Sequence, residues 1–205
     1  MAEQILTPTE ALTEKIAVGD LQEDAGQLAT AYELDKLHTA IIECQSRGFL
    51  TKIISRTKPV TGLYIYGGVG RGKTMLMDMF FASLPDGNGG PIGWRLHFHD
   101  FMGLAQDLIH AAREAGKADP IGEAATQLAS RGRVLCFDEM EVRDIADAMI
   151  VARLFTAIFD EGVTLVATSN RYADDLYKGG LHRDRFLPFI ALLTQRCKLV
   201  EIGEG

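Results

Sequence analysis

The stretch "LYIYGGVGRGKTMLMDMF", residues 63–80, decides the fold of this chain. It joins a short run of aromatic and β-branched residues to a glycine-rich loop, and the loop to a helix-forming segment. Residues 67–74 match the pattern G-x-x-x-x-G-K-[ST], with a strand entering the loop and a helix leaving it. The pattern predicts a loop that binds nucleotide phosphates; the alternative is a glycine turn that matches by chance.

Each residue type in this loop has a physical reason. Phosphate oxygens lie against backbone N–H groups, so side chains must be absent where the chain wraps around them. A helix that begins near Lys73 directs the positive end of its dipole at the same charge. We expect Lys73 to reach the β- and γ-phosphates, Thr74 to bind Mg²⁺ and the Met75 N–H to contact the α-phosphate. The phosphate-binding residues are therefore predicted to be Gly67, Gly68, Val69, Gly70, Arg71, Gly72, Lys73, Thr74 and Met75.

Strand-like and helix-like segments alternate after this point. We expect strands at residues 63–67, 94–101, 133–139, 163–170 and 198–202, and helices at 73–84, 102–117, 144–162 and 183–196. Such alternation implies right-handed crossovers and a parallel sheet covered by helices on both faces. The strands are nearly continuous apolar runs, as a sheet buried on both faces requires. The predicted fold class is α/β, a P-loop NTPase with a parallel sheet flanked by helices.

The first quarter of the chain is expected to be a helical appendage. Residues 9–18 read as a short helix and residues 23–54 as a longer one, whose apolar residues recur at spacings of two to four. The polar connector "SRTKPVTG" follows. We therefore divide the chain into an N-terminal helical segment, residues 1–58, and a P-loop ATPase core, residues 59–205.

Composition limits the class of protein. With 205 residues the chain fits one domain with a small appendage, and its net charge of −7 argues against a general nucleic-acid grip. The three cysteines, Cys44, Cys136 and Cys197, form no Cys-x-x-Cys pair and are expected to be single thiols in a reducing compartment. The N-terminal sequence resembles neither a signal nor a transit peptide, and no run approaches ~18 apolar residues. We expect a cytoplasmic protein.

Two acids at the end of an apolar run bear on hydrolysis. "VLCFDE" ends in Asp138, which at a strand end can enter the Mg²⁺ shell beside Thr74, and Glu139, which can activate water as a general base. Alternatively, both are solvated acids that cap a strand. "LVATSN" ends the next strand and would place Asn170 beside the phosphate loop, although an amide at a strand end is also a common turn former.

Arg183 and Arg185 follow in "GLHRDRFLPFI". An arginine presented to the γ-phosphate of a neighbouring subunit can speed hydrolysis by ~10³–10⁵. The alternative is that both arginines lie on a solvent-exposed helix face. The chain has no Asn/Thr-Lys-x-Asp stretch for guanine and no arginine-rich kinase lid, so ATP hydrolysis is the predicted reaction.

Together these segments resemble a known family. "GLYIYGGVGRGKTMLMDMFF", "HFHDFM", "LCFDEMEVRDIADAMIVARLF", "GVTLVATSN" and "DLYKGGLHRDRFLPFI" are similar to the bacterial ZapE cell-division ATPases and their mitochondrial relatives. The resemblance implies an AAA+-type core, with Asp138 and Glu139 as the metal-binding and water-activating acids. It also implies Asn170 as the γ-phosphate sensor and Arg183 or Arg185 as the inter-subunit arginine.

The resemblance also implies partners. Bacterial members are linked to constriction of the division ring of the tubulin-like protein FtsZ at the inner membrane, and mitochondrial ones to quality control of inner-membrane proteins. A homo-oligomeric ring and peripheral membrane association follow as expectations. Within the family, Gln27 of the Asp24-x-x-Gln27 pair is a candidate adenine contact; the alternative is that Asp24 caps a helix start.

Two departures from the family stand out. The stretch after Asn170 is "RYADDLY", whereas family members usually carry a proline there. The family is also longer, and this chain ends at "VEIGEG", just after the last expected strand. We therefore expect no C-terminal helical lid, and with it weaker nucleotide affinity and slow turnover.

Three further features carry smaller expectations. His97 and His99 are expected on one face of a strand, a spacing that could hold a metal, although packing is the simpler reading. Met75, Met77 and Met79 are expected to fill the core.

The predicted function is that of an ATP-hydrolysing protein that acts on protein partners. The alternatives are an ATP-gated binding module and a helicase-loader-like ATPase.

Overall fold

A five-stranded parallel sheet forms the centre of the protein. The computed structural model describes residues 5–50, 60–87 and 90–203. The strand order is β4-β5-β6-β1-β7, and every neighbouring pair is parallel. The strands are β1 (Gly62–Tyr66), β4 (Gly93–His97), β5 (Val134–Asp138), β6 (Thr164–Ser169) and β7 (Cys197–Glu201). The predicted α/β fold with a parallel sheet is confirmed.

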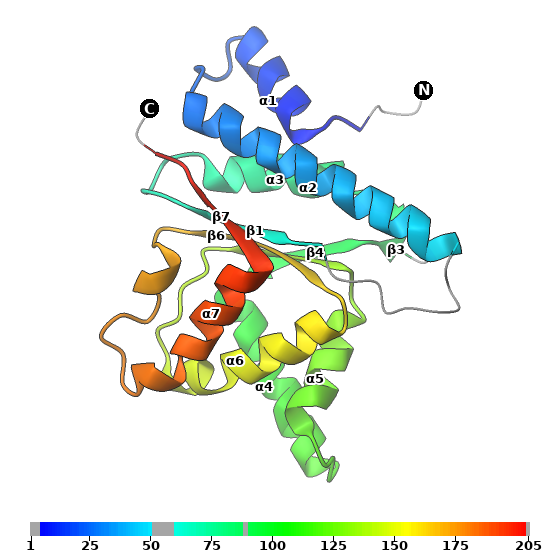
Figure 1. Ribbon diagram of the computed structural model, residues 1–205, viewed down its shortest axis with the longest axis vertical. Helices are drawn as coiled ribbons and strands as arrows, with labels where there is room; N and C mark the ends of the chain where they lie inside the picture. Colours follow the sequence, from blue (N-terminus) through cyan, green and yellow to red (C-terminus); the bar gives the residue numbers. More distant parts are fainter. Residues whose placement is uncertain (1–4, 51–59, 88–89, 204–205) are drawn as a thin grey trace.

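Helices cover both faces of this sheet (Figure 1). On one face lie α1 (Pro8–Ala17), α2 (Ala25–Leu50) and α3 (Lys73–Ser83). On the other lie α4 (Phe98–Glu114), α5 (Pro120–Ala129), α6 (Ile145–Asp160) and α7 (Leu187–Arg196). Short elements complete the path: the antiparallel pair β2 (Asp86–Gly87) and β3 (Gly90–Pro91), and the 3₁₀ turns η1 (Ala173–Asp175) and η2 (Arg183–Arg185).

The alternation of side chains along the strands divides the core into two clusters. Leu63 and Ile65 of β1 join the cluster under α1, α2 and α3, whereas Tyr64 between them joins the cluster under α4 to α7. Cys136 and Phe137 of β5 divide in the same way. Successive side chains of a strand point to opposite faces, so each strand contributes to both cores. This explains why the strands read as continuous apolar runs.

The expected strand 94–101 is wrong in its second half. β4 ends at His97, and α4 begins at Phe98. Phe98, Phe101, Met102 and Ala105 are all buried, and their spacing of three and four is that of a helix face. Four residues are too few to separate the period of a strand from that of a helix, so the sequence alone does not locate this boundary. His97 and His99 therefore do not share the face of one strand.

Other boundaries also differ from expectation. Helix α5 was not predicted, and the expected helix 183–196 is divided into η2 and α7, with a proline in the first turn of α7. The expected helix 23–54 begins at Ala25 and is described as far as Leu50, so residues 51–54 lie outside the described residues. The predicted division at residue 59 falls in the same gap. It stays a prediction.

The N-terminal helices share their core with the sheet. Leu34, Leu37 and Ile41 of α2 belong to one buried cluster with strand residues of β1, β5 and β6. Met77 and Met79 of α3 are buried in that cluster, which confirms them as core residues.

Cys136 and Cys197 are buried in strands, and Cys44 on α2 is half-buried; all three are free thiols. Among the helices that the structure describes, none is both long and apolar enough to cross a bilayer.

Candidate functional site

The predicted phosphate loop connects β1 to α3 at the carboxyl edge of the sheet. Gly70 and Gly72 have φ values of 80° and 82°, a left-handed conformation that side chains with a Cβ rarely adopt. Lys73 is buried at the first position of α3, and its Nζ donates to the carbonyl oxygens of Gly67 at 2.9 Å and Gly68 at 2.7 Å. The lysine thus closes the loop across its open side, where a phosphate would be bound.

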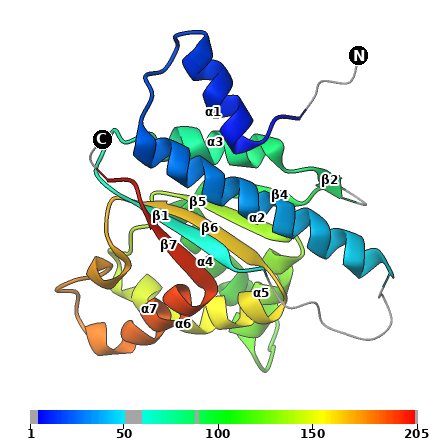
Figure 2. The same cartoon turned by 45° about the horizontal axis from the view of Figure 1, so that its top comes forward.

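Residues far apart in the sequence support this loop. The Gln27 side-chain amide donates to the Arg71 carbonyl at 3.2 Å, and a Cβ on Gly72 would lie 3.0 Å from the same nitrogen. The Arg71 guanidinium pairs with Asp24 at 3.0 Å and also donates to the Gly203 carbonyl. Figure 2 shows the end of β7 beside the loop between β1 and α3. The start of α2 and the end of β7 therefore fix the loop from two sides.

The Asp24-x-x-Gln27 pair lies at the start of α2, next to the phosphate loop. The Asp24 carboxylate accepts the Gln27 backbone N–H at 2.9 Å, so it caps the start of α2. The capping alternative that the sequence left open is present in the structure. The Gln27 side chain lies against the loop, and its contact with adenine stays a prediction.

The two predicted acids lie at the end of β5. Asp138 is buried, and its two carboxylate oxygens accept from Arg95 of β4, from Nε at 2.6 Å and from Nη2 at 3.0 Å. Glu139 is exposed and has a φ of 53°, and its N–H donates to the Thr168 hydroxyl at 3.2 Å. A non-glycine residue in this conformation stores roughly 1–3 kcal/mol of strain, which is a common property of functional sites. Asp138 is not merely a solvated strand cap.

The electrostatics connect the acid and the loop. Burial lowers the pKa of Lys73, and the nearby charge of Glu139 opposes that shift. The Lys73 ammonium and the Glu139 carboxylate are therefore close enough to influence each other. Between β5 and β1 lies β6, whose Ser169 pairs in register with Tyr66 just before the loop. Asn170 follows Ser169 and is exposed, one position beyond the residue that pairs with Tyr66.

The two candidate arginines differ in their surroundings. Both lie in η2, on the connection that leads from β6 to α7. The half-buried Arg183 donates to the backbone carbonyls of Asp174 and Leu176, the latter at 3.2 Å. Arg185 is exposed. Arg183 therefore has a second task in holding the turn around η1, whereas the Arg185 side chain faces solvent.

The donor set fits a magnesium nucleotide. The loop carries positive-φ glycines at the start of a helix, and a lysine that rests on the loop's own carbonyls and could turn to a phosphate. Thr74 is exposed in the first turn of α3, and the Asp138 carboxylate retains lone pairs beyond the two bonds from Arg95. Hydroxyl and carboxylate oxygens are the ligands that Mg²⁺ prefers. The residues present therefore suit ATP with its metal.

Sequence reasoning missed two residues of this site, Arg95 and Thr168. Arg95 stands in a strand whose other residues are mainly apolar, and a charge in such a run requires a buried partner. The charged residue in this apolar run was therefore a signal for an acidic partner on a neighbouring strand. Thr168 lies within β6 and resembles any β-branched strand residue, so nothing in the sequence distinguished it.

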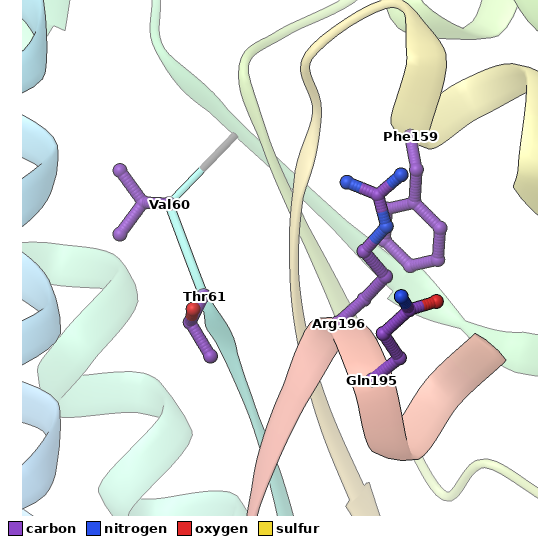
Figure 3. A pocket seen from close by; sticks show the side chains of 5 residues that line it. All are labelled: Val60, Thr61, Phe159, Gln195 and Arg196. Carbon is purple, nitrogen blue, oxygen red and sulfur yellow. The ribbon is translucent and has the colours of Figure 1, made fainter. Parts of the chain in front are cut away.

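A separate hollow of about 190 Å³ lies at the opposite edge of the sheet (Figure 3). Its lining comes from the amino ends of strands and the carboxyl ends of helices: Val60, Thr61, Phe159, Gln195 and Arg196. The Arg196 guanidinium stacks over the Phe159 ring at 5.6 Å. None of the predicted site residues lines this hollow, and we assign it no part in the chemistry.

The fold is that of a P-loop NTPase of AAA+ type. Among solved structures, the crystal structure of DnaI superposes with a TM-score of 0.57 at 16% identity and covers 90% of this chain and 89% of its own. The DnaC helicase loader gives a TM-score of 0.54 at 14% identity, with coverage of 87% and 91%. At these identities the likeness shows the fold alone.

The chain belongs to the AFG1-like ATPase family, whose model matches residues 6–205. It is 38% identical to the cell division protein ZapE of Escherichia coli (strain K12) over 98% of its own length. It spans only 56% of that relative's length. The family resemblance inferred from the sequence is confirmed.

Proposed function

We propose that this chain binds ATP with Mg²⁺ in the loop of residues 67–74 and hydrolyses it to ADP and phosphate. The observation that carries the proposal is the meeting of two features at one edge of the sheet. One is a loop closed by Lys73, and the other is the acid pair Asp138–Glu139 on a strand two positions away. Family membership supports the same reaction.

The residues would divide the work as follows. The backbone N–H groups of the loop and of Met75 hold the phosphates, and Lys73 turns from the loop carbonyls to the β- and γ-phosphates. Thr74 and Asp138 hold the metal, which when bound neutralises charge that develops on the phosphates. Glu139 accepts the proton of the attacking water, while Asn170 orients that water.

We further propose that the active form is a homo-oligomer in which Arg183 or Arg185 reaches the γ-phosphate of a neighbouring subunit. The exposed position of Arg185 supports its candidacy, and Arg183 would have to leave the carbonyls that it now contacts. The hydrolysis rate per subunit should then rise with protein concentration, and one of the two alanine variants should remove that rise. A flat concentration dependence would contradict the shared site.

The biological task that we propose is work on a protein partner in bacterial cell division, in the cytoplasm at the inner face of the membrane. The similarity to a cell division protein supports it, and the tubulin-like FtsZ is the partner to test. Quality control of membrane proteins, and an ATP-gated binding module without turnover, remain alternatives.

A helicase-loader-like role is the second candidate, favoured by the shared fold with the DnaC helicase loader. The net charge of −7 opposes it, because nucleic-acid affinity depends on basic surface. Titration with labelled single-stranded DNA over a range of salt concentrations separates the two. Binding that weakens steeply with salt would favour the loader role.

Nucleotide titration tests the central proposal. Wild type should bind a fluorescent ATP analogue in the presence of Mg²⁺, and Lys73→Ala should bind it at least about a hundredfold more weakly. Lys198→Gln, which removes a lysine near the amino end of β7 that pairs with Glu33 at 2.7 Å, is the matched control. Equal binding by wild type and Lys73→Ala would overturn the proposal.

A further inference from the structure

Arg95 joins the two elements that would hold the metal. Its guanidinium contacts Asp138 at the end of β5 and Asp78 on α3. The Arg95 side chain is 18% exposed, that of Asp138 9% and that of Asp78 62%. We call this set the Asp78–Arg95–Asp138 triad. It connects the strand of the acid pair to the helix that leaves the phosphate loop.

The geometry of the triad determines how Asp138 is oriented. Nε and Nη2 of Arg95 form a planar fork on both oxygens of the carboxylate, at 2.6 Å and 3.0 Å. A fork of this kind sets the plane of the carboxylate as well as its position. Each oxygen keeps a lone pair for one more donor or for the metal shell. Asp138 is therefore presented in one orientation before any ligand arrives.

The same contact fixes the spacing between Asp138 and Thr74. Asp78 lies four residues after Thr74 on α3, so both side chains project from one face of that helix. The third nitrogen of Arg95, Nη1, donates to Asp78. A single guanidinium thus contacts one expected metal ligand, Asp138, and the helix that carries the other, Thr74.

The positive charge of Arg95 has two opposite effects on the expected metal site. Arg95 compensates a buried carboxylate, which would be costly to bury alone, but its positive charge also repels a divalent cation. Asp78 offsets that repulsion, because the triad as a whole carries −1. The expected net effect is that the triad favours the cation, and that Asp78 is needed for this.

We propose that Arg95 is a positioning residue for Mg²⁺, which orients Asp138 and holds it in register with Thr74, with Asp78 as its counter-anion. This inference rests on the proposed function. The two simpler readings are an ion pair that only stabilises the fold, and a cation that competes with the metal for Asp138. The three readings differ in what they predict for metal-dependent nucleotide affinity.

The experiment measures the affinity for a non-hydrolysable ATP analogue with EDTA and with saturating Mg²⁺. The ratio of the two dissociation constants is the metal gain. In Arg95→Gln the metal gain should fall by about 10–100-fold, the usual cost of losing a residue that orients a metal ligand. The EDTA affinity should stay within about twofold of wild type, because the hydrogen bonds of Arg95 go to Asp138 and Asp78 and not to residues 67–74.

Two further variants sharpen the test. Arg95→Lys keeps the charge but loses the fork, so its metal gain should lie between those of wild type and Arg95→Gln. Asp78→Asn leaves the Arg95 charge without its counter-anion and should lower the metal gain by a smaller factor. Lys198→Gln, the control near the amino end of β7, should keep the full gain. Melting curves in EDTA establish whether each variant is folded. If Arg95→Gln does not fold, the metal gains of Arg95→Lys and Asp78→Asn test the inference instead.

Each outcome has a distinct meaning. An unchanged metal gain in folded Arg95→Gln overturns the inference. If the affinities with EDTA and with Mg²⁺ fall by the same factor, which leaves the gain unchanged, the ion pair is purely structural. A larger gain replaces the inference with competition between Arg95 and the metal. If wild type binds no nucleotide, the proposed function fails as well, and this result is distinguishable from the other outcomes.

Discussion

The backbone of Glu139 fixes the position of this residue at the end of β5. Its φ of 53° turns the chain sharply after β5, and the bond from its N–H to Thr168 at 3.2 Å fixes that turn against β6. The side chain is thereby exposed at the carboxyl edge of the sheet, whereas the preceding Asp138 remains buried. Two adjacent acids thus receive different environments, which suits the proposed roles of metal ligand and general base.

Replacement of Glu139 by Gln should separate hydrolysis from binding. The amide keeps the shape of the side chain but cannot accept a proton, so phosphate release should fall by roughly 10²–10⁴-fold. Nucleotide affinity should change by less than about threefold, since the phosphate loop is intact. Phosphate-release and titration assays measure the two quantities. Full partner function in this variant would favour the ATP-gated module.

Replacement of Gly72 by Ala should weaken both the fold and the site. The residue has a φ of 82°, and the new Cβ would lie 3.0 Å from the Gln27 amide nitrogen. The left-handed conformation alone should lower the free energy of unfolding by about 1–2 kcal/mol. Urea unfolding measures this. Gly103→Ala, in α4 with nothing within 4 Å of the added Cβ, should instead be neutral or stabilising by up to ~1 kcal/mol.

Predictability at this scale depends on how local each signal is. The loop and the acid pair could be read from the sequence because their residues are consecutive. Arg95 could not be assigned a partner, because Asp138 and Asp78 lie 43 and 17 positions away. The different surroundings of Arg183 and Arg185 likewise depend on where the carbonyls of Asp174 and Leu176 lie.

At the scale of elements, α4 and α6 are joined by a buried polar contact. The Gln106 amide donates to Asp147 at 2.6 Å, and Asp147 is 8% exposed. Burial raises the pKa of Asp147; the bond from Gln106 and the charge of His99 partly oppose this shift. The stability that a carboxyl with a raised pKa contributes is present below its ordinary pKa, and is lost as pH rises through the raised value.

Asp147→Asn should therefore be more stable than wild type at pH 7, because the amide can still accept from Gln106 and carries no charge. The advantage should shrink as pH falls through the raised pKa of Asp147 toward the ordinary carboxyl value, because the side chain is then protonated. Urea unfolding at pH 7 and pH 4 measures both differences. Asp107→Asn, an exposed change of the same type on α4, is the control. A variant less stable at both values would contradict the expected burial penalty.

Most elements were predictable because their periodicity extends over many residues. α5 was missed, since "PIGEAATQLA" is short and follows a polar stretch that resembles a loop. Its buried residues, Ile121, Ala124, Ala125 and Leu128, recur at helical spacing, but two of the four are alanines. The burial of small residues is decided by packing against α4 and α6, which local sequence does not reveal.

At the scale of the whole molecule, two cores on opposite faces of one sheet stabilise the fold. Aromatic rings dominate the face under α4 to α7, where Phe155 contacts the rings of four other phenylalanines. Aliphatic and methionine side chains dominate the other face. Because α2 supplies Leu34 to that second core, we expect the N-terminal helices and the sheet to unfold together.

Leu34→Ala tests this cooperation. Leu34 is fully buried, and its truncation should cost about 2–5 kcal/mol. In a chain of this size each kcal/mol lowers Tm by roughly 2–4 °C, so a single transition should move down by several degrees. Tyr32→Ala, on the same helix but 58% exposed, should cost less than about 1 kcal/mol. Two separate transitions would show that residues 1–58 fold as a unit of their own.

The distribution of thiols has a practical consequence. Burial raises the pKa of the Cys197 thiol to about 12 and that of Cys136 further, so neither forms the reactive thiolate while the sheet is closed. Half-buried Cys44 on α2 is left as the site where a maleimide dye should attach to the native protein. Slow labelling of the other two, followed by mass spectrometry, would then time the opening of the sheet in the unmutated chain.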